Sequence, residues 1–161
     1  MRTVAIALDG VLRKPLDVEA QDFGASLLYA GLNNHFRVVI LGTDNPARDE
    51  QFLAINGIGR YVKIEPLRPE DGEGVAEQKR AQIARLRAEG FRFEFVVVPD
   101  PELAYHLYVE GVPVLLYLHP TFSAKSFRPD YDGGIRPWTE LAEEVEFQLN
   151  AKAERLRQEQ V

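Results

Sequence analysis

The chain has 161 residues, a formal net charge of −6 and no cysteine. This length fits one domain with a substantial core, and the lack of cysteine excludes disulfides, thiolate metal sites and cysteine nucleophiles. The acidic balance disfavours a nucleic-acid interface built on positive charge. We expect a cytoplasmic protein, because no apolar run approaches the roughly 20 residues of a membrane span and no signal-peptide pattern precedes the first strand.

Apolar, β-branched runs alternate with helix-like periodicity along the chain. The predicted strands are residues 2–8, 37–42, 61–64, 91–98 and 112–118. The predicted helices are residues 18–33, 45–56 and 75–89. Gly57 and Gly90 are placed to end the second and third of these helices. The segment 66–74 is rich in proline, glycine and acidic residues, which predicts an exposed loop.

Three apolar patterns define the expected core. The helix over 18–33 is predicted to bury one stripe, formed by Phe23, Leu27, Leu28 and Leu32. The helix over 75–89 is predicted to turn Ile83 and Leu86 inward. Alternation with Arg92 and Glu94 predicts one buried strand face, formed by Phe91, Phe93 and Phe95.

After a long irregular loop over 119–134, helical periodicity returns at Pro137. We predict a helix over about 137–158 as part of a single domain that comprises residues 1–161. Its apolar residues near one face are Trp138, Leu141, Val145, Leu149 and Leu156. This helix is longer than a small core needs, so it is a candidate surface for a homo-oligomer or a larger assembly, with Phe147 off the main stripe.

Strands that alternate with helices predict an α/β fold, with a parallel sheet covered by helices on both faces. In such sheets ligands bind beyond the carboxyl ends of the strands, where the winding reverses. Asp9, Thr43 and Asp100 each follow the carboxyl end of a predicted strand. We therefore expect these three residues to share one site.

The segment 4–11 resembles the first motif of the haloacid dehalogenase-like (HAD) phosphohydrolases, a hydrophobic strand followed by Asp-x-Asp-Gly. The resemblance assigns the acid/base position to Asp9. It assigns the nucleophile position to Ala7, whose methyl group can neither attack phosphorus nor bind a metal. Thr43 is similar to the second-motif hydroxyl that binds the phosphoryl group, and Lys79 to the third-motif lysine that balances charge.

The resemblance also implies a three-layer Rossmann-like fold with strand order 5-4-1-2-3. Residues 95–100 look like the fourth motif, so a magnesium ion would rest on Asp100, Asp9 and, at a different spacing, Glu102. Because Ala7 removes one ligand, magnesium binding should be weakened. The short spacing between motifs is similar to that of minimal, nearly capless members. The last part of the chain resembles small phosphatase-like proteins of actinobacteria and their phages.

Each of these positions has a structural alternative. Asp9 and Gly10 fit an ordinary turn, and either Thr43 or Asp44 fits the cap of the following helix. Lys79 fits a solvated helix face. Asp100 before Pro101 fits a strand-to-helix cap.

Two functions follow. The first is a catalytically inactive HAD-like protein, a pseudo-phosphatase, that binds a phosphorylated small molecule or a protein partner. Its role would be binding, assembly or, for a phage protein in the host cytoplasm or virion, a structural or accessory one. The alternative is a metal-dependent phosphohydrolase of nucleotide or nucleic-acid phosphomonoesters, with Asp9 as general base and Asp100, Glu102 or Asp44 on the metal. A third interpretation is an unrelated parallel α/β domain.

Overall fold

One parallel sheet organises the structure, with β1 (Thr3–Ala7) at its centre. The other strands are β2 (Arg37–Leu41), β3 (Lys63–Glu65), β4 (Phe93–Val98) and β5 (Val114–Leu116). Their order is β3-β2-β1-β4-β5, and every pair is parallel. Counted from the opposite edge, this is the predicted order 5-4-1-2-3, so the predicted fold class is confirmed. All of β1 is buried, as a strand covered on both faces requires.

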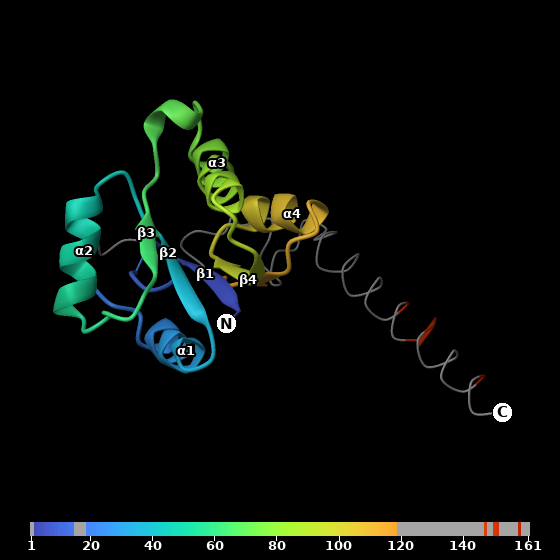
Figure 1. The fold of residues 1–161 in the computed structure, drawn as a ribbon, viewed down its shortest axis with the longest axis horizontal. Coiled ribbons are helices and arrows are strands. Elements are labelled where there is room, and N and C mark those ends of the chain that lie inside the picture. Colours follow the sequence, from blue (N-terminus) through green and yellow to red (C-terminus); the bar gives the residue numbers. More distant parts are fainter. Residues whose placement is uncertain (1, 15–18, 119–146, 148–149, 152–157, 159–161) are drawn as a thin grey trace, which may run out of the picture. The chain divides into compact units, whose positions relative to one another are not determined.

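The computed structural model describes residues 2–14, 19–118, 147, 150–151 and 158. The chain divides into two units, Met1–Phe122 and Ser123–Val161, and the sheet with its covering helices belongs to the first (Figure 1). In the second unit, Phe147, Asn150, Ala151 and Gln158 are helical. The rest of the helix predicted over 137–158 lies outside the described residues, and the single-domain assignment stays a prediction. Within the described part, no helix is long and apolar enough to cross a membrane.

Among the described residues, four helices cover the sheet: α1 (Phe23–Asn33), α2 (Pro46–Ile55), α3 (Val75–Ala88) and α4 (Pro101–Val109). A short 3-10 helix, Pro69–Asp71, lies in the predicted loop. Side chains of α1 and α2 pack in one core cluster and those of α3 and α4 in the other, so the helices form a layer on each face. Asp22 and Asn45 cap α1 and α2 by accepting hydrogen bonds from the N–H groups of Ala25 (3.0 Å) and Arg48 (3.2 Å).

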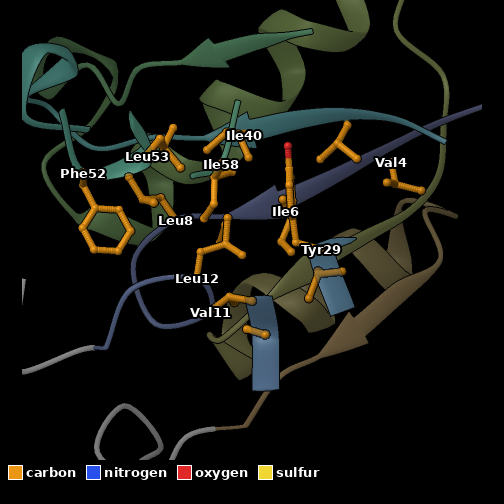
Figure 2. Packing of buried hydrophobic residues seen from close by; sticks show 14 residues of the cluster. Val4, Ile6, Leu8, Val11, Leu12, Tyr29, Ile40, Phe52, Leu53 and Ile58 are labelled. Atoms are coloured by element: carbon orange, nitrogen blue, oxygen red, sulfur yellow. The ribbon is translucent and has the colours of Figure 1, made fainter. Parts of the chain in front are cut away.

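The two core clusters use alternate residues of the strands. Figure 2 shows the first cluster, where Ile6, Leu8 and Ile40 meet Tyr29 of α1 and Leu53 of α2. The second cluster lies on the other face of the sheet. It includes Ala5, Val39, Val96, Ile83, Leu86, Leu103 and Leu107. The prediction that Ile83 and Leu86 turn inward is confirmed.

The predicted buried stripe of α1 is wrong in part. Phe23 and Leu27 are 78% and 76% exposed, whereas Ala25 and Tyr29 are buried. Leu27 lies two residues from each of these, which is about 200° around the helix, so it points away from the sheet. Leu28 and Leu32 flank the buried side and pack against the first cluster, as predicted.

The prediction of one buried face for Phe91, Phe93 and Phe95 is also wrong in part, because Phe91 and Phe93 pack against the same cluster but Phe95 does not. Thr3 of β1 pairs with Phe93, but Ala5 pairs with Val96, so β4 holds one extra residue in this interval. Such a bulge reverses the alternation of side chains beyond it. Phe93 therefore packs with the second cluster and Phe95 with the first, where its ring meets Phe36 edge-on at 5.6 Å.

A side-chain hydrogen bond joins the end of the sheet to the start of α1. Tyr117, directly after β5, donates its hydroxyl to Asp22 Oδ1 at 2.7 Å, across 95 residues of sequence. Burial and this contact with the carboxylate raise the pKa of Tyr117 from 10.0 to about 12. Asp22 thus serves both the helix cap and the contact with the segment after β5.

Replacing Tyr117 with Phe should lower the free energy of unfolding by roughly 1 kcal/mol at neutral pH. The phenol has a higher pKa in the folded chain than in the unfolded chain. Its contribution is therefore complete below pH 10 and is lost as the pH rises toward 12. Denaturant unfolding across this range should show a steeper loss for the unmodified chain than for Tyr117→Phe. Tyr108→Phe is the matched control, because Tyr108 is 64% exposed, and an identical effect of both changes would contradict the prediction.

Candidate functional site

Three predicted site residues lie at the same edge of the sheet. Ile6 of β1 pairs with Ile40 of β2 and with Val97 of β4. Asp9, Thr43 and Asp100 each come three residues after one member of this aligned trio. Because parallel strands end at a common edge, all three residues leave the sheet at its carboxyl edge, where the winding reverses between β1 and β4.

A closed turn after β1 positions the first of these residues. The Arg13 N–H donates to Leu8 O and the Gly10 N–H donates to Arg13 O, both at 2.9 Å. Gly10 has φ of 80°, a conformation that glycine adopts without strain. The turn therefore folds back on itself and brings the side chain of Arg13 beside that of Asp9.

Arg13 forms ion pairs with two carboxylates. Its Nε donates to Asp9 Oδ1 at 2.6 Å, and its Nη2 donates to Asp49 Oδ1 at 3.2 Å. The side chains of Arg13 and Asp49 are 3% and 0% exposed, whereas that of Asp9 is 42% exposed. The Arg13 guanidinium also lies 5.4 Å from the ring centroid of Phe52. Its Nη1 is buried and has no hydrogen-bond partner among the described residues.

Thr43 is bound by the same buried carboxylate. Its backbone N–H donates to Asp49 Oδ2 at 2.6 Å, and its hydroxyl lies 2.9 and 3.0 Å from the two Asp49 oxygens. The single hydroxyl proton is therefore directed at Asp49. The cap of α2 is Asn45, so the alternative that Thr43 or Asp44 caps this helix is not what the structure adopts.

Asp100 caps α4, which is the strand-to-helix cap given above as the structural alternative to a metal ligand. Its Oδ1 accepts from the N–H groups of Glu102 at 2.9 Å and Leu103 at 3.4 Å. The side chain of Glu102 is 67% exposed, and its carboxylate lies 3.9 Å from Nε2 of His106. The helix N-terminus thus already uses one oxygen of Asp100.

Lys79 is half-buried on α3 and makes no side-chain ion pair or hydrogen bond with the described residues. The cation of α3 that reaches the strand ends is Arg85, which binds Glu65, Asp71 and, at 2.8 Å, the carbonyl of Pro66. Burial opposes ionisation of Glu65, but hydrogen bonds from Lys63 and Arg85 outweigh it and lower its pKa. Two cations thus hold a buried carboxylate at the end of β3.

Sequence reasoning missed Arg13, Asp49 and Gln82. Gln82 is 1% exposed and donates to the carbonyls of Gly42 (3.0 Å) and Glu65 (2.6 Å), so it fastens α3 to the ends of β2 and β3. The four-residue spacing of Asp9 and Arg13 could have suggested their pairing. No pattern marks Asp49, which lies between Arg48 and Glu50 in a polar stretch.

The magnesium site that the resemblance implies can be tested against these donors. Ala7 offers no ligand atom, Asp9 is paired with a guanidinium, and one oxygen of Asp100 caps a helix. Among the described residues, no three His, Asp or Glu side chains lie close enough together to hold a metal ion. The unpartnered N–H of Arg13 calls for an acceptor, which a cation is not. These residues do not form the oxygen cage that magnesium requires.

Comparison with known proteins supports the fold. A chain in the structure of the Pnkp1/Rnl/Hen1 RNA repair complex aligns with a TM-score of 0.61 and 16% sequence identity. The alignment covers 73% of this chain and 42% of the other, so this chain spans less than half the length of that relative. At this identity the likeness concerns the fold alone. No family model and no curated protein matches the sequence.

Replacing Asp49 with Ala should lower the free energy of unfolding by about 3–5 kcal/mol, because it leaves a buried guanidinium and the Thr43 N–H without their acceptor. Urea unfolding measures the loss. The neighbouring Asp44→Ala is the control, since Asp44 is exposed and should change stability by no more than about 0.5 kcal/mol. Equal losses of unfolding free energy in the two variants would contradict the prediction, because the buried carboxylate would then stabilise the chain no more than an exposed one.

Proposed function

We propose that this chain is a HAD-like pseudo-phosphatase, a protein that acts by binding and performs no aspartyl-phosphate chemistry. One observation carries the proposal. Ala7 ends the central strand where the resemblance puts the nucleophile, and no carboxylate replaces it there. Covalent phosphoryl transfer needs an activated nucleophile at this point.

The surrounding contacts support the same proposal. Asp9, at the acid/base position, is tied to Arg13, and the Thr43 hydroxyl is directed at Asp49. Both groups would have to leave an internal partner before they could act on a phosphoryl group. The strand order and the likeness to part of an RNA repair complex are compatible with HAD ancestry.

The exposed apolar side chains favour a protein partner. Phe23 and Leu27 lie on the outer side of α1. Tyr105, Tyr108 and Val109 are 64–65% exposed on α4, at the i, i+3 and i+4 spacing that places them together on its outer side. Apolar groups gathered in this way are more typical of interaction surfaces than scattered single residues. A phosphorylated small molecule is the second ligand class, because the carboxyl edge is where such sheets bind ligands.

The alternative function, a metal-dependent phosphohydrolase without a covalent intermediate, is favoured by one observation. The Asp9 side chain is 42% exposed, so this carboxylate reaches solvent at the carboxyl edge. As a general base, Asp9 would need to be free of Arg13 and near a metal-bound phosphate.

A magnesium-dependent phosphatase assay tests the proposal. The unmodified chain should hydrolyse neither nucleotide nor aryl phosphates above a protein-free blank. We expect the same of Ala7→Asp, because a new carboxylate frees neither Thr43 from Asp49 nor Asp9 from Arg13. The double variant Ala7→Asp/Asp9→Asn is the control for background hydrolysis.

The other outcomes discriminate between the functions. Turnover by the unmodified chain that disappears in Asp9→Asn would reject the pseudo-phosphatase in favour of the phosphohydrolase. Turnover by Ala7→Asp alone would mean that one side chain blocks an otherwise competent scaffold. The binding role would then stand, while the internal contacts of Asp9 and Thr43 would be no obstacle to chemistry.

A further inference from the structure

We infer that Arg13 is a built-in cation that takes over the charge-balancing role of a metal ion at the carboxyl edge of the sheet. The inference deepens the proposed function and rests on it, since a pseudo-phosphatase does not need the metal for chemistry. The site disfavours divalent cations because a guanidinium already occupies an oxygen of each of its two carboxylates.

Two carboxylates from different elements share the one guanidinium. Asp9 belongs to the turn after β1 and Asp49 to α2, and Arg13 contacts both, at 2.6 and 3.2 Å. Within the described part of the chain, neither carboxylate has another ion-pair partner. Asp49 is fully buried, so without Arg13 it would be an uncompensated charge out of water, a strongly unfavourable state.

Arg13 cannot easily give way to an ion. Its backbone N–H and carbonyl close the turn with Leu8 and Gly10, and its guanidinium lies near the ring of Phe52. The side chain is 3% exposed. To vacate the site, the guanidinium would have to leave a buried position and its contact with Phe52.

The site also contains an unused donor. Nη1 of Arg13 is buried and has no acceptor among the described residues, so the site holds a hydrogen-bond donor to spare. A divalent cation placed here would be repelled by the guanidinium and would compete with it for the same carboxylate oxygens. Metal binding is therefore opposed by Arg13, in addition to being weakened by the ligand that is missing at Ala7.

The test is thermal unfolding of the full chain in magnesium chloride and in sodium chloride of the same ionic strength. The unmodified chain should give the same Tm in both. Arg13→Gln should lower the Tm by roughly 10 °C in sodium chloride, since it leaves buried charge unpaired. Magnesium at about ten times a Kd of about 1 mM should then raise the Tm by roughly 3 °C, because Asp9 and Asp49 have lost their cation.

Arg85→Gln is the matched control. Arg85 also bridges two carboxylates, but Glu65 keeps Lys63 at 2.8 Å when Arg85 is removed. This variant should lose stability without any magnesium-specific recovery. Arg13→Lys keeps a positive charge and should show no magnesium response. Arg13→Gln/Asp49→Asn removes the buried carboxylate too, and it should regain stability and respond to magnesium no more than the unmodified chain.

A magnesium-specific rise in Tm for the unmodified chain would overturn the inference, as would an Arg13→Gln variant that is as stable as the parent. An Arg13→Gln variant that is destabilised equally in both salts would reduce Arg13 to an ordinary buried ion pair and also reject it. If Arg13→Gln fails to fold in sodium chloride, magnesium chloride of the same ionic strength should restore a thermal unfolding transition, and its failure to do so would reject the inference. No readout involves activity, so turnover by the unmodified chain would reject the proposed function without being confused with these results.

Discussion

The buried ion pair between Arg13 and Asp49 is the contact on which the carboxyl edge of this protein depends. It joins the turn after β1 to α2 and, through Asp49, holds the backbone N–H and hydroxyl of Thr43. Burying two full charges is expensive, and the cost is offset only when hydrogen bonds satisfy most of their polar atoms. At this edge Asp9, Thr43 and Asp49 are thus already engaged by other groups of the protein. In an enzyme of this architecture, groups in these positions would be kept for the substrate.

A second buried carboxylate at the same edge is also held by cations of the protein. Glu65 ends β3 at 2% exposure and is bound by Lys63 and Arg85, while Gln82 donates to its backbone carbonyl. Arg85 also binds Asp71, so it ties the loop after β3 to α3. Polar contacts within the protein therefore join α2 and α3 to the ends of β2 and β3, and they rigidify this half of the edge.

Much of the fold could be predicted from sequence, because it rests on local signals that agree with one another. The alternation of strands and helices predicted the parallel sheet, and the family resemblance supplied the strand order. Gly57 and Gly90 indeed end their helices with positive φ. The buried side of α1 could not be predicted, because two apolar pairs, Phe23 with Leu27 and Leu28 with Leu32, each have the four-residue spacing of one helix face. Only packing against the sheet decides which pair is buried. The bulge in β4 depends on pairing with β1, about 90 residues away in sequence, so alternation alone placed Phe95 on the wrong face.

In the candidate site, too, local sequence signals predicted some features, and others depend on the tertiary fold. Positions set by strand ends, such as Asp9, Thr43 and Asp100, could be placed on a common edge from topology. What these side chains bind depends on partners that reach them through the tertiary fold. Arg13 returns through a turn, and Asp49 comes from a helix whose polar sequence gives no sign that one carboxylate is fully buried. Motif matching therefore placed these residues at one edge of the sheet but did not reveal the ion pairs that they form.

The central place of β1 also constrains how the chain can be synthesised and folded. One side of β1 pairs with β2 within the first 41 residues, but its other side pairs only with β4, which ends at Val98. Until β4 has left the ribosome, the nascent sheet has an apolar edge with unpaired backbone N–H and C=O groups at what will become its middle. Such an edge invites pairing with other chains, and closing a long loop to cover it is slow. The strand that is most deeply buried in the folded protein is thus the one most prone to aggregation during synthesis.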